Sequence, residues 1–245
     1  MYKFFKVAEF DAVGGPQNAT MGQDGFMETP TKKGRFVVGY IGKHRSYSRY
    51  GFSSEVAWGT PLREHQGKVQ IYINKSWIDL SKYTKAYHGY TEESILDYLK
   101  KWNKKLTTFN DEKGKYELPD SWIYNDFGHL TIKYFKDSNE NYKLDKGEAF
   151  MGDFIHTTSK DEVATIKGRV VSLSGSHGCI HVKPNDIDVL VKYYIKIGSI
   201  VEVKSYQEKT AMTTFEQSYG RPPYETHFYP GKRKIFIYKV TKIQQ

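Results

Sequence analysis

A chain of 245 residues is long enough for one large domain, or for one domain with an appendage. Hydrophobic residues make up 38% of the chain and charged residues 27%, a balance that is typical of a folded globular protein and excludes a largely disordered one. The formal net charge of +9 favours polyanionic surroundings such as nucleic acid, a membrane surface or a bacterial wall polymer. The lysines are scattered, and neither zinc-finger spacing nor a glycine-rich phosphate motif is present, so we expect no nucleic-acid partner.

The N-terminal residues, interrupted by Lys6, Glu9 and Asp11, lack the apolar core of a signal sequence. An export signal was therefore removed, or export takes another route, or the protein stays inside the cell. No apolar run approaches the roughly 18 residues of a membrane-spanning helix, so we expect no transmembrane segment.

The predicted elements are mostly short strands rich in β-branched and aromatic residues, at 35–41, 68–73, 129–135, 154–157, 169–174, 199–203 and 234–240. Two helices interrupt them. Thr91 can cap a helix that follows it, with Glu92 and Glu93 in the first turn and apolar residues on one face. After Pro184, Asn185 can cap a second helix that ends before Gly198. The chain is therefore predicted to be mainly β with a few helices.

The segment SGSHGCIHV, Ser174 to Val182, contains the only cysteine of the chain. A cysteine nucleophile needs a base for its proton and donors for the oxyanion, and a lowered pKa activates it. His177 and His181 flank Cys179, and His156 lies on a predicted strand that can pair with the cysteine strand. Gly178 lets the backbone turn so that amide groups can face a carbonyl oxygen. A buried structural cysteine is the alternative, because free cysteine is among the most buried residue types.

Four segments in order resemble the catalytic domain of the L,D-transpeptidases, the peptidoglycan cross-linking family with a cysteine nucleophile. They are ETPTKKGRF (28–36), GDFIHTT (152–158), SHGCIHV (176–182), and the helix and strand that follow the last of these. The resemblance is thin between about residues 44 and 127, where we expect an insertion that holds the Thr91 helix. It implies a curved mixed β-sandwich over residues 1–205, and we expect residues 206–245 to form an extension that ends in a strand.

The resemblance also implies the residue roles. Cys179 would be the nucleophile, His156 the general base, and the Thr157 carbonyl the group that orients the imidazole. His177 and Gly178 would shape the oxyanion site, with Ser176 supporting the turn. His181 stands where the family usually has asparagine or arginine, and we expect it near the substrate carboxylate.

A second pattern, Asp137 to Glu148, is similar to a twelve-residue calcium loop. The oxygen-donor positions are occupied by Asp137, Asn139, Asn141, Asp145 and Glu148. Tyr142 stands where such a loop needs glycine with positive φ, and strands rather than helices are predicted on both sides. A polar hairpin tip is the alternative. We expect no cofactor to be required, and at most a weak structural calcium ion.

The resemblance implies a peptidoglycan-modifying cysteine acyl-transferase in the periplasm or cell wall. It would cleave between the third, L-centred residue of a stem peptide and the terminal D-alanine through a thioester. Transfer to a second stem would give a 3→3 cross-link, transfer to a free D-amino acid an exchange, and transfer to water an L,D-carboxypeptidase. An antibacterial effector with an immunity protein as partner, and a non-catalytic wall-binding module, are the alternatives.

Overall fold

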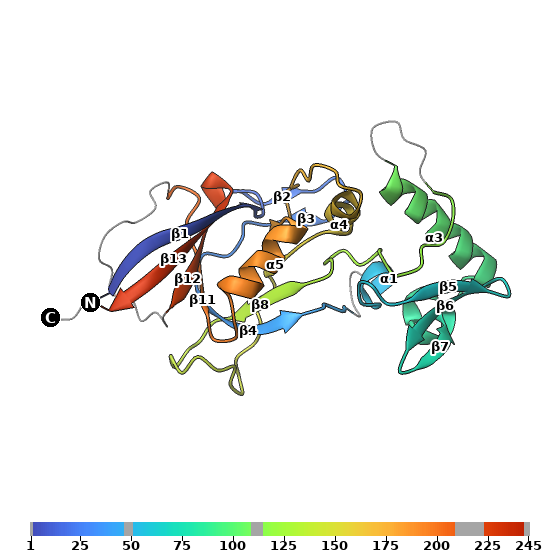
Figure 1. Ribbon diagram of the computed structural model, residues 1–245, viewed down its shortest axis with the longest axis horizontal. Coiled ribbons are helices and arrows are strands. Elements are labelled where there is room, and N and C mark those ends of the chain that lie inside the picture. Colours follow the sequence, from blue (N-terminus) through green and yellow to red (C-terminus); the bar gives the residue numbers. More distant parts are fainter. Residues whose placement is uncertain (1, 47–50, 109–114, 209–222, 243–245) are drawn as a thin grey trace. The chain divides into compact units, whose positions relative to one another are not determined.

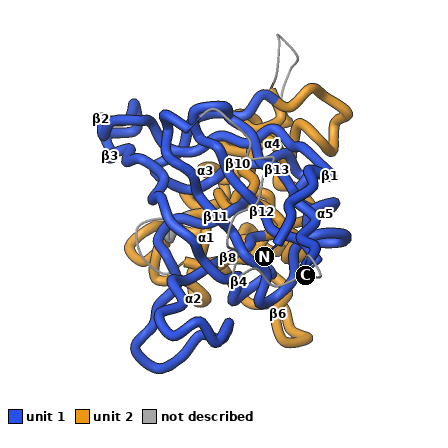
Figure 2. The backbone as a smooth tube through the Cα atoms, turned by 90° about the vertical axis from the view of Figure 1, so that its left-hand side faces the viewer, with its two compact units in different colours: residues 1–42, 131–156, 172–245 blue, residues 43–130, 157–171 orange. Residues whose placement is uncertain are grey.

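The computed structural model describes residues 2–46, 51–108, 115–208 and 223–242. The chain divides into two compact units (Figure 2). Unit 1 comprises residues 1–42, 131–156 and 172–245, and unit 2 comprises residues 43–130 and 157–171. The first segment of unit 2 falls where the insertion at about 44–127 was expected, and residues 157–171 join it.

Unit 1 is built on eight strands that close into a barrel, in the order β1-β10-β9-β8-β4-β11-β12-β13. The bounds are β1 (Tyr2–Val13), β4 (Gly34–Gly42), β8 (Thr131–Phe135), β9 (Ile155–His156), β10 (Ile180–Val182), β11 (Ile200–Val203), β12 (Tyr224–Tyr229) and β13 (Lys234–Lys242). The β9–β10 and β11–β12 pairs are parallel, and the other pairs are antiparallel.

Closure depends on the long first strand, which the sequence analysis did not identify. β1 pairs with β13 from Tyr2 to Asp11 and with β10 at Ala12 and Val13, so one strand joins both ends of the sheet. A register shift between Lys6 and Ala8 marks an irregularity of the kind that bends a strand. One closed sheet therefore takes the place of the two facing layers of the expected sandwich.

The C-terminal strands are an integral part of this sheet. β13 lies between β1 and β12 and pairs with both along most of its length (Figure 1). The chain from residue 206 onward, expected as an extension, thus supplies two of the eight strands. The core of unit 1 is made of strand residues at most 4% exposed, among them Phe36, Val38, Ile132, Tyr134, Ile155, Ile180, Val201, Phe228 and Ile237.

Three smaller elements complete the described part of unit 1. β2 (Thr20–Met21) and β3 (Met27–Glu28) form a short hairpin. α5 (Pro184–Tyr193) starts with Pro184 in its first turn, where the missing N–H costs nothing, and Lys183 rather than the expected Asn185 is the N-cap residue. A 3-10 turn, η2 (Pro230–Lys232), connects β12 to β13.

Unit 2 contains the antiparallel sheet β5 (Leu62–His65), β6 (Lys68–Ile73) and β7 (Ser76–Asp79). Its helices are α1 (Gly51–Ser54), α2 (Leu80–Tyr83), α3 (Glu92–Thr107) and α4 (Ser159–Ile166), with the 3-10 turn η1 (Lys85–Tyr87). α3 lies beside the small sheet (Figure 1). A core cluster of ten buried residues is shared among these elements, including Leu62, Val69, Ile71, Ile95, Leu99, Trp122 and Tyr124.

The Thr91 helix is confirmed. The Thr91 hydroxyl oxygen accepts the Ser94 N–H at 3.2 Å, and Ile95 and Leu99 on one face are buried. The strand predicted at 169–174 is wrong, because these residues have no regular structure. Val170, which the pattern placed in a strand, is 87% exposed. Within the described ranges, no helix has the length and apolar character needed to cross a membrane.

Candidate active site

The pairing of two short strands places His156 beside the loop that carries Cys179. β9 and β10 are parallel, with Ile155 opposite Ile180 and His156 opposite His181. The Ile180 N–H also donates to the Phe154 carbonyl oxygen at 2.9 Å, so the pairing begins where Cys179 enters β10. Because side chains alternate along a strand, Phe154 and His156 share one face of β9, and His181 shares that face on β10.

The neighbouring strand β8 adds a lysine to the same face. Thr131 lies opposite His156 in the antiparallel β8–β9 pair, and Lys133 follows Thr131 by two residues. The Lys133 ammonium lies 5.5 Å from the centre of the Phe154 ring and 5.4 Å from that of Tyr40. Burial lowers the pKa of Lys133, and the negative form of Cys179 opposes that change.

Cys179 is a partly exposed residue whose thiol is held protonated. Its Sγ lies 3.8 Å from the Gly152 carbonyl oxygen, which can accept a weak hydrogen bond from the thiol. Burial raises the pKa of Cys179 to about 12, the charge of Asp153 acts in the same direction, and Lys133 only partly opposes it. The lowered pKa expected for a cysteine nucleophile is therefore absent in the free protein. Burial of the sulfur raises the pKa of Cys179 more than the Lys133 ammonium lowers it.

The turn before Cys179 is stabilised by Ser176. The Ser176 hydroxyl donates to the Cys179 carbonyl oxygen and accepts the Gly178 N–H at 3.1 Å. This fits the supporting role expected for Ser176. It also directs the Gly178 amide at Ser176 rather than at an oxyanion. Gly178 has φ of +130°, a conformation that favours glycine.

His177 points toward the β2–β3 hairpin. Its Nε2 lies 2.9 Å from the Asp24 carboxylate, and its ring meets the edge of Phe26 at 6.5 Å between centroids. The Thr29 hydroxyl donates to the His177 carbonyl oxygen at 3.0 Å. His177 therefore ties the cysteine loop to this hairpin, and its ring is engaged with Asp24.

His181 is buried and uncharged at neutral pH. Burial lowers its pKa to about 4, and only 8% of the residue is exposed. Its Nδ1 lies 3.1 Å from the Ser174 carbonyl oxygen, which can only accept, so Nδ1 carries the proton. The His181 ring packs edge-on against the His156 ring at 4.8 Å. His181 is therefore an uncharged neighbour of His156, and its expected place near the substrate carboxylate stays a prediction.

Thr157 follows His156 in the chain and belongs to unit 2. It is fully buried, and its hydroxyl donates to Glu162 of α4. The same Glu162 oxygen accepts the His129 N–H at 3.0 Å. Thr157 is therefore fixed by side-chain contacts within its own unit.

The residues of the predicted calcium loop form hydrogen bonds with one another. Side-chain amides of Asn139 and Asn141 donate to the Asp145 carboxylate, and the Glu148 carboxylate accepts backbone N–H groups of Ser138 and Asp145. Tyr142 adopts φ of +64°, the conformation for which the sequence offered no glycine, and its N–H donates to Asp137 Oδ2 at 2.7 Å. Within the described part of the chain, Asp137 Oδ1 is buried and accepts no hydrogen bond.

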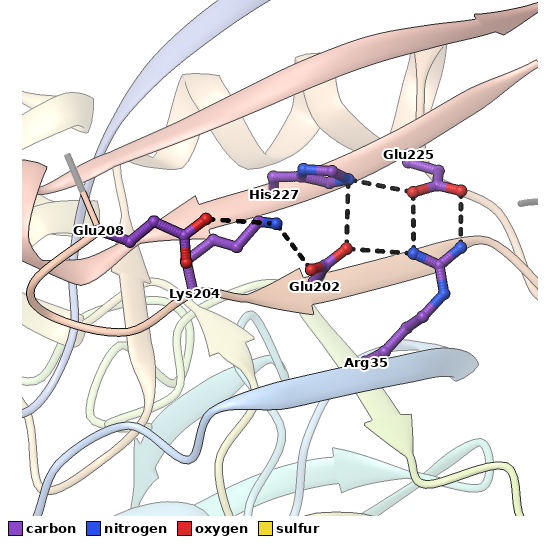
Figure 3. Close-up of polar contacts among 6 residues, drawn as sticks. All are labelled: Arg35, Glu202, Lys204, Glu208, Glu225 and His227. Atoms are coloured by element: carbon purple, nitrogen blue, oxygen red, sulfur yellow. Dashed lines mark hydrogen bonds and ion pairs between the residues drawn. The ribbon is translucent and has the colours of Figure 1, made fainter. Parts of the chain in front are cut away.

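A second group of potential metal ligands, which the sequence analysis did not identify, lies on β11 and β12. Atoms of Glu202, Glu225 and His227 lie within 4.8 Å of one another. Arg35 binds both oxygens of Glu225, the shorter contact being 2.7 Å, and also reaches Glu202 at 3.1 Å (Figure 3). Lys204 binds Glu202 at 2.7 Å. Two cations already neutralise these carboxylates, so the group fits an ion-pair network better than a metal site.

Burial alone would raise the pKa of Glu225, but hydrogen bonds from His227 and Arg35 outweigh burial and hold the pKa at about 2. Glu225 is fully buried, so this charge depends entirely on its partners. The network joins β4, β11 and β12 across the barrel wall.

Comparison of the chain with models of known protein families, with curated proteins and with solved structures finds no match. The site must therefore be read from its own residues. Sequence reasoning missed Lys133, Asp153 and Asp24. A lysine inside the apolar strand at 129–135, and an acid inside GDFIHTT, were the signals for the first two. Asp24 depends on a hairpin contact that no local pattern encodes.

Proposed function

We propose that this protein is a cysteine acyl-transferase that acts on peptidoglycan stem peptides, of the L,D-transpeptidase kind that its motifs resemble. The observation that carries the proposal is the parallel pairing of β9 with β10, because it places an imidazole on the strand next to the only cysteine. Glycine at position 178 and the Ser176 contacts hold the cysteine at a sharp turn, as a nucleophile exposed to a substrate requires.

The protonation state of the Cys179 thiol bears on when its proton is transferred during the reaction. With a pKa of about 12 for Cys179, little thiolate is present at neutral pH, so we expect proton transfer to His156 to accompany attack. Sγ then bonds to the carbonyl carbon of the third stem residue. The bond from that carbon to the D-alanine nitrogen breaks, and D-alanine leaves with the proton held by His156. An amine or water next attacks the thioester carbon, the new C–N or C–O bond forms and the C–Sγ bond breaks. His156 carries the proton that the nucleophile loses to the sulfur, which restores the thiol.

The test is mass spectrometry of a purified disaccharide-tetrapeptide incubated with the protein. Loss of the terminal D-alanine, a 3→3 dimer, or exchange with an added D-amino acid is the expected result, and it names the acceptor. Cys179→Ala and His156→Ala should abolish these products. His65→Ala, a histidine exposed on β5 of unit 2, is the matched control and retains full turnover. Turnover by Cys179→Ala would overturn the proposal.

A second candidate function is favoured by two properties of the thiol. The raised pKa of Cys179 and the hydrogen bond from its thiol to Gly152 also suit a buried structural cysteine in a wall-binding module. Such a module would bind insoluble peptidoglycan equally well with alanine at position 179 and would leave every stem intact. Sedimentation with purified sacculi, together with the stem analysis above, separates the two functions.

A further inference from the structure

The small sheet of unit 2 has one face in the core and one face toward solvent. Val69 and Ile71 of β6 belong to the core cluster of this unit. Because side chains alternate along a strand, their neighbours on β6 lie on the opposite, outer face. The strand register sets side chains of β5 and β7 beside them, and the outer face is made of Arg63, Gln70, Tyr72, Trp77 and Asp79.

Two aromatic rings are exposed on the outer face. Tyr72 is 40% exposed and Trp77 is 36% exposed. Their ring centroids lie 5.3 Å apart with the planes tilted by 55°, so the rings touch without stacking face to face. The Arg63 guanidinium lies 4.1 Å from the centroid of the Trp77 ring. These contacts hold Trp77 in place, and the exposed parts of both rings are available to a ligand, a use for which tyrosine and tryptophan are favoured at surfaces.

Hydrogen bonds fix the polar groups of the outer face. Arg63 donates through Nε and Nη2 to the Gln70 side-chain oxygen at 3.0 and 2.9 Å. Gln70 Nε2 donates to Asp79 Oδ1 at 2.8 Å, and Lys68 and Lys82 lie 3.2 and 3.4 Å from Asp79 Oδ2. A ligand therefore meets donors and acceptors that are already positioned, which lowers the entropy cost of binding.

The charge of this surface is positive. Three cationic side chains, Arg63, Lys68 and Lys82, surround the single carboxylate of Asp79. Lys68 and Lys82 share that carboxylate, and Arg63 has no carboxylate partner among the residues that the structure describes. The surplus of positive charge favours an anionic ligand, and the guanidinium of Arg63 is the group best suited to a ligand carboxylate.

Two kinds of polymer combine negative charge with rings that can lie on an aromatic surface: acidic polysaccharides and single-stranded nucleic acids. Sugar hydroxyl groups donate hydrogen bonds, and the side-chain oxygens of Gln70 and Asp79 can accept them. A nucleic acid brings a phosphate with every unit, which Asp79 repels, and the two lysines that could offset this are already bound to Asp79. The outer face therefore fits an acidic sugar better than a nucleotide.

We propose that the outer face of the β5–β6–β7 sheet binds an acidic polysaccharide, with sugar rings on Trp77 and Tyr72 and a sugar carboxylate on Arg63. All of these residues belong to unit 2, so the inference does not depend on the acyl transfer proposed for unit 1. A ligand of this class also agrees with the net charge of +9, which favours polyanionic surroundings.

Binding is tested on the full chain by isothermal titration calorimetry. The probes are a hyaluronan hexasaccharide, in which every second sugar carries a carboxylate, and the methyl ester of the same hexasaccharide, which lacks these charges. We expect the acid to bind at least about tenfold more tightly than the ester at low ionic strength, and the difference to shrink as salt is added. A deoxythymidine decamer is the nucleic-acid probe and should bind more weakly than the acid.

Substitutions on the outer face locate the ligand. Trp77→Ala should weaken binding of the acid by about tenfold, as loss of one stacking contact does, and Trp77→Phe should restore most of it. Arg63→Gln should weaken binding of the acid by about tenfold and leave the ester unchanged, because only the charged ligand uses the guanidinium. Tyr116→Ala and Lys105→Gln, an exposed aromatic residue and an exposed cation elsewhere in unit 2, are the matched controls.

Fluorescence shows whether the ligand covers Trp77. Of the four tryptophans, Trp58 and Trp122 are buried, Trp102 is half-buried and Trp77 is exposed, so acrylamide quenches Trp77 most strongly. The acid should reduce this quenching in the unaltered protein and have no effect in Trp77→Phe. Absence of binding by the acid, equal affinity for acid and ester, tighter binding of the deoxythymidine decamer, or unchanged affinity in Trp77→Ala overturns the inference.

Discussion

The protonated state of Cys179 predicts slow alkylation at neutral pH. Against a free cysteine of pKa about 8.5, a pKa of about 12 makes the thiolate fraction at pH 7 about 3000-fold smaller. A more basic thiolate is intrinsically more nucleophilic, with a Brønsted slope near 0.4–0.5, which recovers about 25-fold to 55-fold. The folded protein should therefore react about 100-fold more slowly with iodoacetamide than the denatured chain, before any steric effect.

The assay follows iodoacetamide incorporation by intact mass between pH 6 and pH 10, in native and denatured protein. The native rate should rise about tenfold per pH unit over the whole range without a plateau. Asp153→Asn should increase the rate, because the charge that disfavours the thiolate is removed. Lys133→Met should decrease it, because the opposing ammonium is removed. The Cys179→Ala variant contains no thiol and is the blank.

A plateau near or below pH 7 would refute the reasoning. It would mean that the sulfur is a thiolate stabilised by a neighbouring imidazolium, as the sequence motif by itself suggested. The Cys179 sulfur would then be exposed to water in solution, its pKa would not be raised, and proton transfer to His156 would precede attack.

Three other predictions concern the turn at Gly178, the ion pair of Glu225 and the 137–148 loop. Gly178→Ala places a methyl group 2.5 Å from Asp153 Oδ1, at a residue whose φ is +130°. Turnover should therefore fall at least about 100-fold, while the circular dichroism spectrum stays unchanged. Full activity of this variant would contradict the tight turn. Glu225→Gln should destabilise the fold by about 3 kcal/mol at pH 7 in urea unfolding, because Arg35 loses its buried partner. Since the pKa of Glu225 is held at about 2, below the ordinary 4.5, its stabilisation is present above pH 4.5 and is lost as pH falls toward 2. The unaltered protein should therefore lose stability between pH 4.5 and pH 2 more steeply than Glu225→Gln. Millimolar calcium should raise the free energy of unfolding by about 1 kcal/mol through the 137–148 loop, and Asp145→Asn should remove that gain; an equal response of both proteins would leave the loop a polar turn.

Local sequence was sufficient for elements whose signals are local. The strand predicted at 68–73 matches β6, and α3 begins at Glu92 directly after its predicted cap Thr91, because a capping threonine and an apolar stripe act over a few residues. α4 was missed although Thr158 caps it through the Asp161 N–H at 3.2 Å, a capping pattern that the sequence carries. β1 is not among the predicted strands, because adjacent apolar residues at Phe4–Phe5 and Val7–Ala8 break the alternation that marks a strand.

The sequence by itself determined that one cysteine, preceded by Ser-His-Gly and followed by a short strand and a helix, is the group to consider for catalysis. The tertiary structure alone decided how that group behaves. The pKa of about 12 for Cys179 and the buried, neutral state of His181 depend on residues distant in the chain. Desolvation and cross-strand neighbours are set by barrel closure through β1, β10 and β13, and no window of sequence contains them together.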